Sequence, residues 1–278
     1  MELWYTENQT PAIRFSCKVN KTLHTAKTPY QEIAVLDTEP FGRMLVLDGM
    51  VQTCTEDEFV YHEMIVHVPL FTHPRPSDVL VVGGGDGGAI REILKHEPVE
   101  KAVLVEIDRE VVECAKQYLP EIASGLNDPR VEVIIEDGIV YLQNNPGQFD
   151  VILVDSTEPV GPAVGLFTED FYRLVYAALR PGGILVAQTE SPFYNADILV
   201  KAYTGMKAVF PRVATYLANI PTYPSGLWSF TLAAKQDAPL PPSRQPAPDF
   251  ASRYYTPELH SSCFVLPRFV KDMLEKAR

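Results

Sequence analysis

Acidic side chains follow four apolar, strand-like runs in the middle of the chain. Asp86 lies in the glycine-rich segment Gly83–Gly88, Glu106 ends the next run, Asp137 follows the third and Asp155 ends the fourth. In an open α/β sheet, ligands bind beyond the carboxyl ends of the strands. Carboxylates gathered there attract a cationic ligand and repel an anionic one. The sequence therefore predicts a binding site for a nucleoside with a cationic group.

The segment Gly83–Gly88 has the composition of a loop that binds a nucleoside cofactor. Glycines let the backbone approach the ligand closely and turn into a helix. Glu106 stands 23 residues after Gly83, where a carboxylate can accept both ribose hydroxyls. Glycine-rich packing beside a solvated acid is the alternative, and the combination favours the nucleoside site. In an adenosylmethionine enzyme, Asp86 would disfavour a carboxylate at the amino-acid end of the cofactor and favour an ammonium.

Two further acidic segments have two interpretations each. Asp137 and Gly138 stand where related sites hold the adenine amino group, but Asp137 equally suits the N-cap of the next helix. Asp155 and Glu158 precede a proline-rich loop that ends near Pro162. A stiff loop with paired acids suits a lid over a cation, whereas a plain turn with a helix cap has the same composition. Both pairs of interpretations remain open on spacing alone.

Aromatic and histidine residues add weaker signals. Tyr223 lies in the proline-containing turn Ile220–Gly226, where its ring could face an ammonium, although such an aromatic more often serves packing. His62 and His67 are five residues apart and have no cysteine or other histidine close by in the sequence. This arrangement matches no common zinc spacing, so we predict no metal site.

The elements that must position these residues fall into two groups. Alternating apolar residues over 33–36 and 44–47, with a turn near Pro40, predict a small antiparallel β unit. Apolar residues then recur at helical spacing from Asp57 to Leu70, and Pro69 is expected to help close that helix. We therefore predict an N-terminal β-strand domain over 1–56 and a catalytic domain over 57–278.

Strand and helix patterns alternate in the second group. Predicted strands cover 79–82, 102–107, 131–135, 151–154 and 184–187, and predicted helices cover about 88–96, 109–118, 138–145 and 168–179. Such alternation predicts an α/β fold with a doubly wound, mainly parallel sheet. A helix near 196–210 and strands near 216–220 and 227–234 would follow. A proline-rich connection over 237–248 and a final helix from about Pro267 complete the prediction.

Composition limits the partners and the compartment. The 278 residues carry a net charge of −12, which disfavours nucleic acid and anionic membranes as partners and favours small cations. The four cysteines form no C-x-x-C pair, no leader is recognisable, and no apolar stretch is long enough to span a bilayer. We therefore expect a cytoplasmic protein without membrane or nucleic-acid partners.

Seven segments occur in the order found in one enzyme family. They are Tyr30–Gln31, Leu47–Gly49, Asp57–Met64, Gly83–Gly88, Val105–Asp108, Asp155–Ala163 and Ile220–Gly226. From about Leu3 to the C-terminus, the chain resembles the polyamine aminopropyltransferases, and within them the spermidine synthases of the bacterial, Bacillus-like type. The resemblance implies a methyltransferase-like Rossmann domain after the small β domain, and a homodimer or homotetramer. It also implies transfer of the aminopropyl group of decarboxylated S-adenosylmethionine to putrescine, giving spermidine and 5'-methylthioadenosine, with no metal or other cofactor.

The resemblance also implies roles for particular residues. Asp155 takes the place of the family's proton acceptor. Glu158 replaces an aspartate that is common in the family, which implies a slightly smaller acceptor pocket. The donor site would include Gln31, Gln52, Asp86, Glu106, Asp137, Gly138 and Pro162, and the acceptor site would include Tyr61, His62, Asp86, Asp155, Glu158 and Tyr223.

The implied chemistry requires a base. An amine with a pKa of about 10.4 is almost fully protonated at neutral pH, and an ammonium has no lone pair with which to attack. An ordinary aspartate is a weak base, so we expect crowding by Asp86, Asp137 and Glu158 to raise the pKa of Asp155. Two alternatives are a methyltransferase that uses intact S-adenosylmethionine and a non-catalytic polyamine-binding protein. The motifs do not distinguish putrescine from cadaverine, agmatine or spermidine as acceptor.

Overall fold

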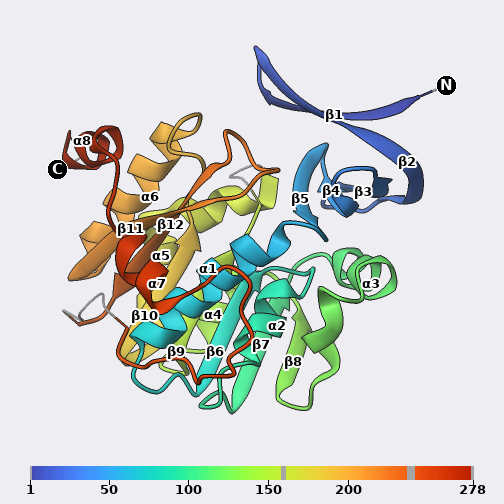
Figure 1. The fold of residues 1–278 in the computed structure, drawn as a ribbon. Helices are drawn as coiled ribbons and strands as arrows, with labels where there is room; N and C mark the ends of the chain where they lie inside the picture. Colours follow the sequence, from blue (N-terminus) through green and yellow to red (C-terminus); the bar gives the residue numbers. More distant parts are fainter. Residues whose placement is uncertain (1, 158–160, 237–241, 277–278) are drawn as a thin grey trace.

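The computed structural model describes residues 2–157, 161–236 and 242–276. An N-terminal antiparallel sheet contains, in spatial order, β1 (Leu3–Thr10), β2 (Ile13–Lys27), β3 (Glu32–Thr38), β4 (Gly42–Leu47) and β5 (Met50–Cys54). The predicted antiparallel β unit is confirmed, although β2 is much longer than the short strands expected. The hairpin of β1 and β2 extends away from the rest of the molecule (Figure 1).

The second sheet has the order β11-β12-β10-β9-β6-β7-β8. Its strands are β6 (Asp78–Gly83), β7 (Lys101–Glu106), β8 (Val131–Ile135), β9 (Phe149–Asp155), β10 (Leu179–Gln188), β11 (Arg212–Asn219) and β12 (Leu227–Ala234). β8, β7, β6, β9 and β10 are parallel, and β12 is antiparallel to both of its neighbours. This confirms the prediction of a doubly wound, mainly parallel, Rossmann-like sheet.

Helices cover both faces of this sheet. They are α1 (Glu58–Thr72), α2 (Gly88–Ile93), α3 (Arg109–Tyr118), α4 (Gly138–Asn144), α5 (Glu169–Ala178), α6 (Ala196–Val209), α7 (Pro257–Ser262) and α8 (Arg268–Lys276), with 3-10 turns η1 (Ala123–Asn127) and η2 (Gly161–Phe167). Val79 and Val81 of β6 face one core with α1 and α2, whereas Leu80 and Val82 face another with α4 and α5. Burial on both faces explains the uninterrupted apolar run of this strand.

Helix α1 differs from its prediction at Pro69. The proline was expected to help end the helix, but the helix continues to Thr72, and the backbone N–H of His73 bonds the carbonyl of Pro69. Pro69 removes one helical hydrogen bond. Every residue of α1 except Phe59 is buried, so tertiary packing outweighs this loss. Helix α7 was not predicted.

The N-terminal sheet packs directly against α3. Ile33 and Leu47 of the sheet share a buried cluster with Val111 and Leu119. Beside it, the Thr28 hydroxyl donates to Asp108 Oδ2 at 2.7 Å. Since Asp108 is the N-cap of α3 and follows β7 closely, this contact fixes the small sheet next to the carboxyl ends of the parallel strands.

Gly83→Ala should destabilise the protein strongly. Gly83 has a φ of +81°, and an added Cβ would lie 2.3 Å from the backbone oxygen of Asp155 on the neighbouring strand. The steric overlap and the left-handed backbone together should lower the free energy of unfolding by about 3 kcal/mol. Urea denaturation of the purified variant measures this change.

Gly147→Ala provides a matched control. Gly147 also has a positive φ, of +66°, but an added Cβ would meet nothing within 4 Å. The substitution should lower the free energy of unfolding by about 1 kcal/mol, from the backbone conformation alone. Equal destabilisation by the two substitutions would contradict the steric argument.

Candidate active site

A pocket opens where the strand order of the large sheet reverses. β6 lies between β7 and β9, and Gly83 is paired with Asp155 at the carboxyl ends of β6 and β9. The pocket is lined by the loop after β6, by the ends of β7 and β9, and by residues of β4 and β5. The position agrees with the general rule for open α/β sheets.

The structure brings ten of the predicted site residues together in this pocket. Glu158 lies outside the described residues, and Pro162 lies in η2, where its side chain is not described. The ten that line the pocket are Gln31, Gln52, Tyr61, His62, Asp86, Glu106, Asp137, Gly138, Asp155 and Tyr223.

Asp155 is held by one oxygen only. Tyr61 donates its hydroxyl to Asp155 Oδ1 at 2.6 Å, whereas the buried Oδ2 has no hydrogen-bond partner among the described residues. Burial, followed by the negative charge of Asp86, raises the pKa of Asp155 to about 6. The expected rise is therefore present, but burial is its larger cause, and Asp137 is not among the causes. A carboxylate with this pKa and an unused oxygen can accept a proton near neutral pH.

Aromatic rings form a wall beside Asp155. The rings of Tyr61 and Tyr223 lie 5.6 Å apart, and Tyr223 packs edge-on against Trp228 at 4.7 Å. The Tyr223 hydroxyl donates to the carbonyl of Gln52 at 2.5 Å, so a residue of β5 and the turn before β12 hold each other in place. The wall suits a ligand with an apolar stem and a cationic end.

Glu106 and Asp137 also line the pocket. Glu106 is buried, its Oε1 accepts the N–H of Asp108 at 2.9 Å, and burial raises its pKa to about 7. A Cβ on Gly85 would lie 2.9 Å from Glu106 Oε2, so a glycine leaves the carboxylate its space. Asp137 caps α4 by accepting the N–H of Ile139 and also lines the pocket. Capping thus accounts for one of its oxygens, and the two interpretations of this residue are compatible.

Gln31 connects the two sheets at the edge of the pocket. Its Nε2 donates to Asp108 Oδ2 at 2.9 Å, the same oxygen that accepts from Thr28. The N-terminal sheet therefore supplies part of the pocket wall and is anchored to the N-terminus of α3.

Sequence reasoning missed three residues of the site region. Gln188 lines the pocket at the end of β10, and applying the strand-end rule to this fifth strand would have found it. Trp228 lines the pocket from within β12 and carries no local signal. Glu58 is buried behind the pocket and contacts His62, and its spacing to His62 of one helical turn was the available signal.

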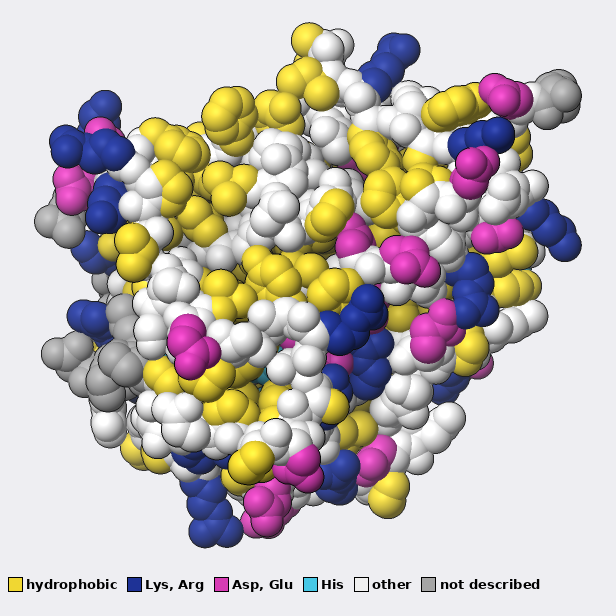
Figure 2. All heavy atoms as spheres, in the orientation of Figure 1, with side chains coloured by type: hydrophobic (Ala, Val, Ile, Leu, Met, Phe, Trp, Pro, Cys, Tyr) yellow, Lys and Arg dark blue, Asp and Glu magenta, His cyan; other side chains and the backbone are white. Residues whose placement is uncertain are grey.

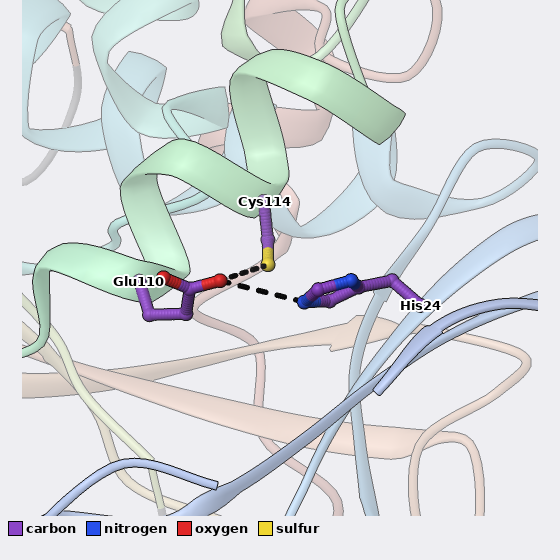
Figure 3. A group of neighbouring side chains, drawn as sticks. All are labelled: His24, Glu110 and Cys114. Atoms are coloured by element: carbon purple, nitrogen blue, oxygen red, sulfur yellow. Dashed lines mark hydrogen bonds and ion pairs between the residues drawn. The ribbon is translucent and has the colours of Figure 1, made fainter. Parts of the chain in front are cut away.

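One group of described residues, apart from the pocket, offers three metal-ligand atoms. His24 of β2 points at Glu110 of α3, with Nε2 and Oε1 3.4 Å apart, and Cys114 Sγ lies 3.6 Å from the same oxygen (Figure 3). Burial and then the charge of Glu110 raise the pKa of Cys114 to about 12, so its thiol is protonated at neutral pH. These contacts belong to the packing between the N-terminal sheet and α3.

The surface gives no sign of a polyanion partner on the face that Figure 2 shows. Acidic and basic side chains are interspersed there rather than gathered into a continuous basic area. Among the described residues, no helix combines the length and apolar character that crossing a bilayer requires.

Similarity to known proteins extends over nearly the whole chain. A model described as spermine/spermidine synthase domain matches residues 58–241, and one described as spermidine synthase tetramerisation domain matches residues 3–56. A polyamine aminopropyltransferase of Caldicellulosiruptor saccharolyticus is 58% identical over 99% of both chains. The corresponding protein of Bacillus mycoides is 53% identical over 99% of this chain and 100% of its own.

Solved structures agree with these relatives. A crystal structure of spermidine synthase in complex with the transition state analogue AdoDATO matches with a TM-score of 0.95 and 41% identity, covering 99% of this chain and 95% of that chain. Spermidine synthase from Thermotoga maritima matches with a TM-score of 0.94 and 41% identity, covering 99% and 94%. The resemblance seen in the sequence is confirmed, and the chain belongs to the spermine/spermidine synthase family.

Proposed function

We propose that this protein is a spermidine synthase, which transfers the aminopropyl group of decarboxylated S-adenosylmethionine to putrescine. The observation that carries the proposal is the unengaged oxygen of Asp155, buried beside Asp86 and a wall of tyrosines. A base of raised pKa, a second carboxylate and an apolar wall are what the attack of a diamine on a sulfonium requires. The names of the relatives and of the matched structures support the same reaction.

The nucleoside end of the donor binds between the N-terminal sheet and the ends of β7 and β8. Glu106 accepts the ribose hydroxyls, Asp137 and Gly138 border the adenine, and Gln31 and Gln52 close the site from the small domain. Burial holds the pKa of Glu106 at about 7, and ligand binding would favour its ionised form because two hydroxyls donate to the charged carboxylate.

The reaction is a displacement at the carbon next to sulfur. Asp155 takes a proton from the near ammonium of putrescine, and the freed lone pair forms the new carbon–nitrogen bond as the carbon–sulfur bond breaks. The electron pair of that bond stays on sulfur and gives neutral methylthioadenosine. Because a sulfonium is already a good leaving group, the reaction needs neither an acid nor a metal ion at the sulfur. Tyr61 and Tyr223 orient the amine, which places it for in-line attack.

Asp86 accounts for the choice of donor. Its carboxylate lies in the loop after β6, next to Asp155. The decarboxylated donor carries an ammonium at this end, whereas intact S-adenosylmethionine adds a carboxylate that Asp86 repels. Asp86 therefore favours an aminopropyltransferase over a methyltransferase. Glu158 is proposed to hold the distal ammonium of the acceptor, and Pro162 to border the donor.

The assembly and the location follow from separate observations. We propose that residues 1–56 form an oligomerisation domain and residues 57–278 the catalytic domain. Leu3, Trp4 and Ile13 of the protruding hairpin are exposed, and such apolar side chains suit burial against another copy in a homodimer or homotetramer. We also propose a cytoplasmic location, which the four free cysteines support.

The proposed function is tested by measuring methylthioadenosine release. Purified protein receives either decarboxylated or intact S-adenosylmethionine with putrescine, cadaverine, agmatine or spermidine, and products are identified by mass. We expect release with the decarboxylated donor and putrescine, with spermidine as the second product. Methyl transfer from the intact donor, or no release with any amine, would refute the assignment.

Asp155→Asn should remove the proton acceptor while leaving the nucleoside site intact. The rate constant kcat should fall by about 10²- to 10⁴-fold, the usual contribution of a general base. Methylthioadenosine affinity, measured by calorimetry, should change little. Asp150→Asn is the control, because Asp150 is the second residue of the same strand, at its far end, and accepts the N–H groups of Ser77 and Asp78. Unchanged turnover in the Asp155 variant would exclude this residue as the base.

Asp86→Asn should weaken the choice between donors. Without the negative charge, affinity for the decarboxylated donor should fall by roughly 10-fold or more, and the affinity ratio of the two sulfonium ligands should approach one. Methylthioadenosine, which has no ammonium, is the control ligand and should bind with little change. Equal losses for all three ligands would show that Asp86 shapes the loop rather than selecting the donor.

A further inference from the structure

A chain of four charged groups runs from Arg91 on α2 through Glu58 and His62 on α1 to Asp86 in the pocket. Both guanidinium Nη atoms of Arg91 donate to the carboxylate of Glu58, at 3.0 and 2.8 Å. Glu58 Oε2 lies 2.5 Å from His62 Nδ1, one turn along α1. His62 Nε2 faces Asp86 Oδ1 at 3.4 Å. Positive and negative groups therefore alternate from Arg91 to Asp86.

The inner members of this chain are shielded from water. Glu58 is 6% exposed and His62 2% exposed. Burial acts to raise the pKa of Glu58, but His62 and Arg91 outweigh it and lower the pKa to about 2. Burial likewise acts to lower the pKa of His62, but Asp86 and Glu58 outweigh it and hold the pKa well above its usual value. An imidazole between two carboxylates carries a proton on each nitrogen.

The position of the ring is fixed by packing as well as by charge. A Cβ on Gly88 would lie 2.2 Å from His62 Cε1 and 2.4 Å from Nδ1, so the ring occupies the space that a side chain at 88 would fill. Tyr61 packs edge-on against the ring at 5.4 Å. The imidazole therefore has little room to turn away from Glu58 and Asp86.

We propose that Glu58, anchored by Arg91, is a positioning residue that keeps His62 as an imidazolium and thereby keeps Asp155 able to accept a proton at neutral pH. The proposal rests on the proposed function in one respect, namely that Asp155 is the base. Two charged groups near His62 come from helices, Glu58 on its own helix and Arg91 on α2 behind Glu58. Two more come from the ends of strands, Asp86 after β6 and Asp155 at the end of β9. Tyr61 is a neutral titratable neighbour.

The link to Asp155 is electrostatic. Burial and Asp86 raise the pKa of Asp155, and the positive charge of His62 opposes that rise. If Glu58 loses its charge, Asp86 alone opposes the effect of burial on His62, and Arg91 loses a carboxylate partner next to the ring, so the neutral imidazole becomes more favourable. The opposing charge then disappears, and the pKa of Asp155 rises further above its present value of about 6. A larger fraction of Asp155 would be protonated at neutral pH and unable to act as the base.

The pH dependence of Glu58→Gln tests this coupling. In the wild-type protein, kcat/KM should rise with pH through the pKa of Asp155, because the base form is active. The acidic limb of this pH profile is the range in which activity rises as Asp155 loses its proton. In the variant, this limb should move to higher pH by about one unit or more. The loss of activity at about pH 7 would then be roughly 2-fold for a movement of one unit and roughly 10-fold for two, and it would shrink as the pH rises. A loss that is the same at every pH would contradict the proposal.

Glu63→Gln is the matched control for structural damage. Glu63 is also buried on α1, but it accepts the backbone N–H groups of Arg253, Tyr254 and Tyr255 at 2.7 to 2.8 Å and does not line the pocket. This variant should unfold more easily and keep the wild-type acidic limb. An equal movement of the limb in both variants would overturn the assignment of the effect to His62.

A second measurement needs no activity. Nitrogen NMR of ¹⁵N-histidine protein, with His62 assigned from a His62→Gln sample, reports the charge of the ring directly. We expect an imidazolium in the wild-type protein at about pH 8 and a neutral ring in Glu58→Gln. A neutral His62 in the wild type at that pH would overturn the proposal even if aminopropyl transfer is observed. If the wild-type protein transfers no aminopropyl group, the proposed function is refuted. The NMR measurement would still test whether Glu58 keeps His62 charged.

Discussion

The site depends on two carboxylates beyond the carboxyl ends of neighbouring parallel strands, the buried Asp86 in the loop after β6 and Asp155 at the end of β9, whose Oδ2 is buried. Two buried like charges are unfavourable unless nearby groups compensate for them. Tyr61 donates to one of them, His62 faces the other, and Glu58 with Arg91 supports His62. The negative charge that these contacts leave uncompensated attracts cations, and the proposed substrates are cations. The repulsion between these two carboxylates is thus the proposed origin of the site's selectivity for cations.

The topology of the sheet explains why these residues meet. The chain leaves β6 toward β7 and later returns to place β9 on the other side of β6, so loops distant in sequence end at one crevice. The N-terminal sheet closes that crevice through Gln31 and through the bond between Tyr223 and Gln52. Neither sheet alone contains a complete pocket. The N-terminal sheet does not carry Asp86 and Asp155, and the large sheet does not carry Gln31 and Gln52.

Periodicity predicted most of the fold because its strands and helices bury regular faces. The predicted end of α1 at Pro69 was wrong, because packing overrides local preference there. Helix α7 was not predicted, because its sequence has no clear periodic pattern. The strand-end rule found Asp86, Glu106, Asp137 and Asp155 together. It could not find Trp228, whose role depends on how β12 lies against the pocket, and it gave Glu58 no meaning, because a solvated helix face and a buried ion pair have the same spacing in sequence.

Helix α1 joins the pocket to the C-terminal segment, which lies beyond the residues 58–241 matched by the family's catalytic model. Tyr61 and His62 lie near one end of this buried helix. At the other end, Arg244 donates to the carbonyl of Leu70, and the N–H of Ser243 donates to the carbonyl of Phe71. A shift of these C-terminal contacts would tilt the helix that carries the site. Evolutionary change in the last part of the chain should therefore be correlated with change along α1, even though no described residue after position 241 lines the pocket.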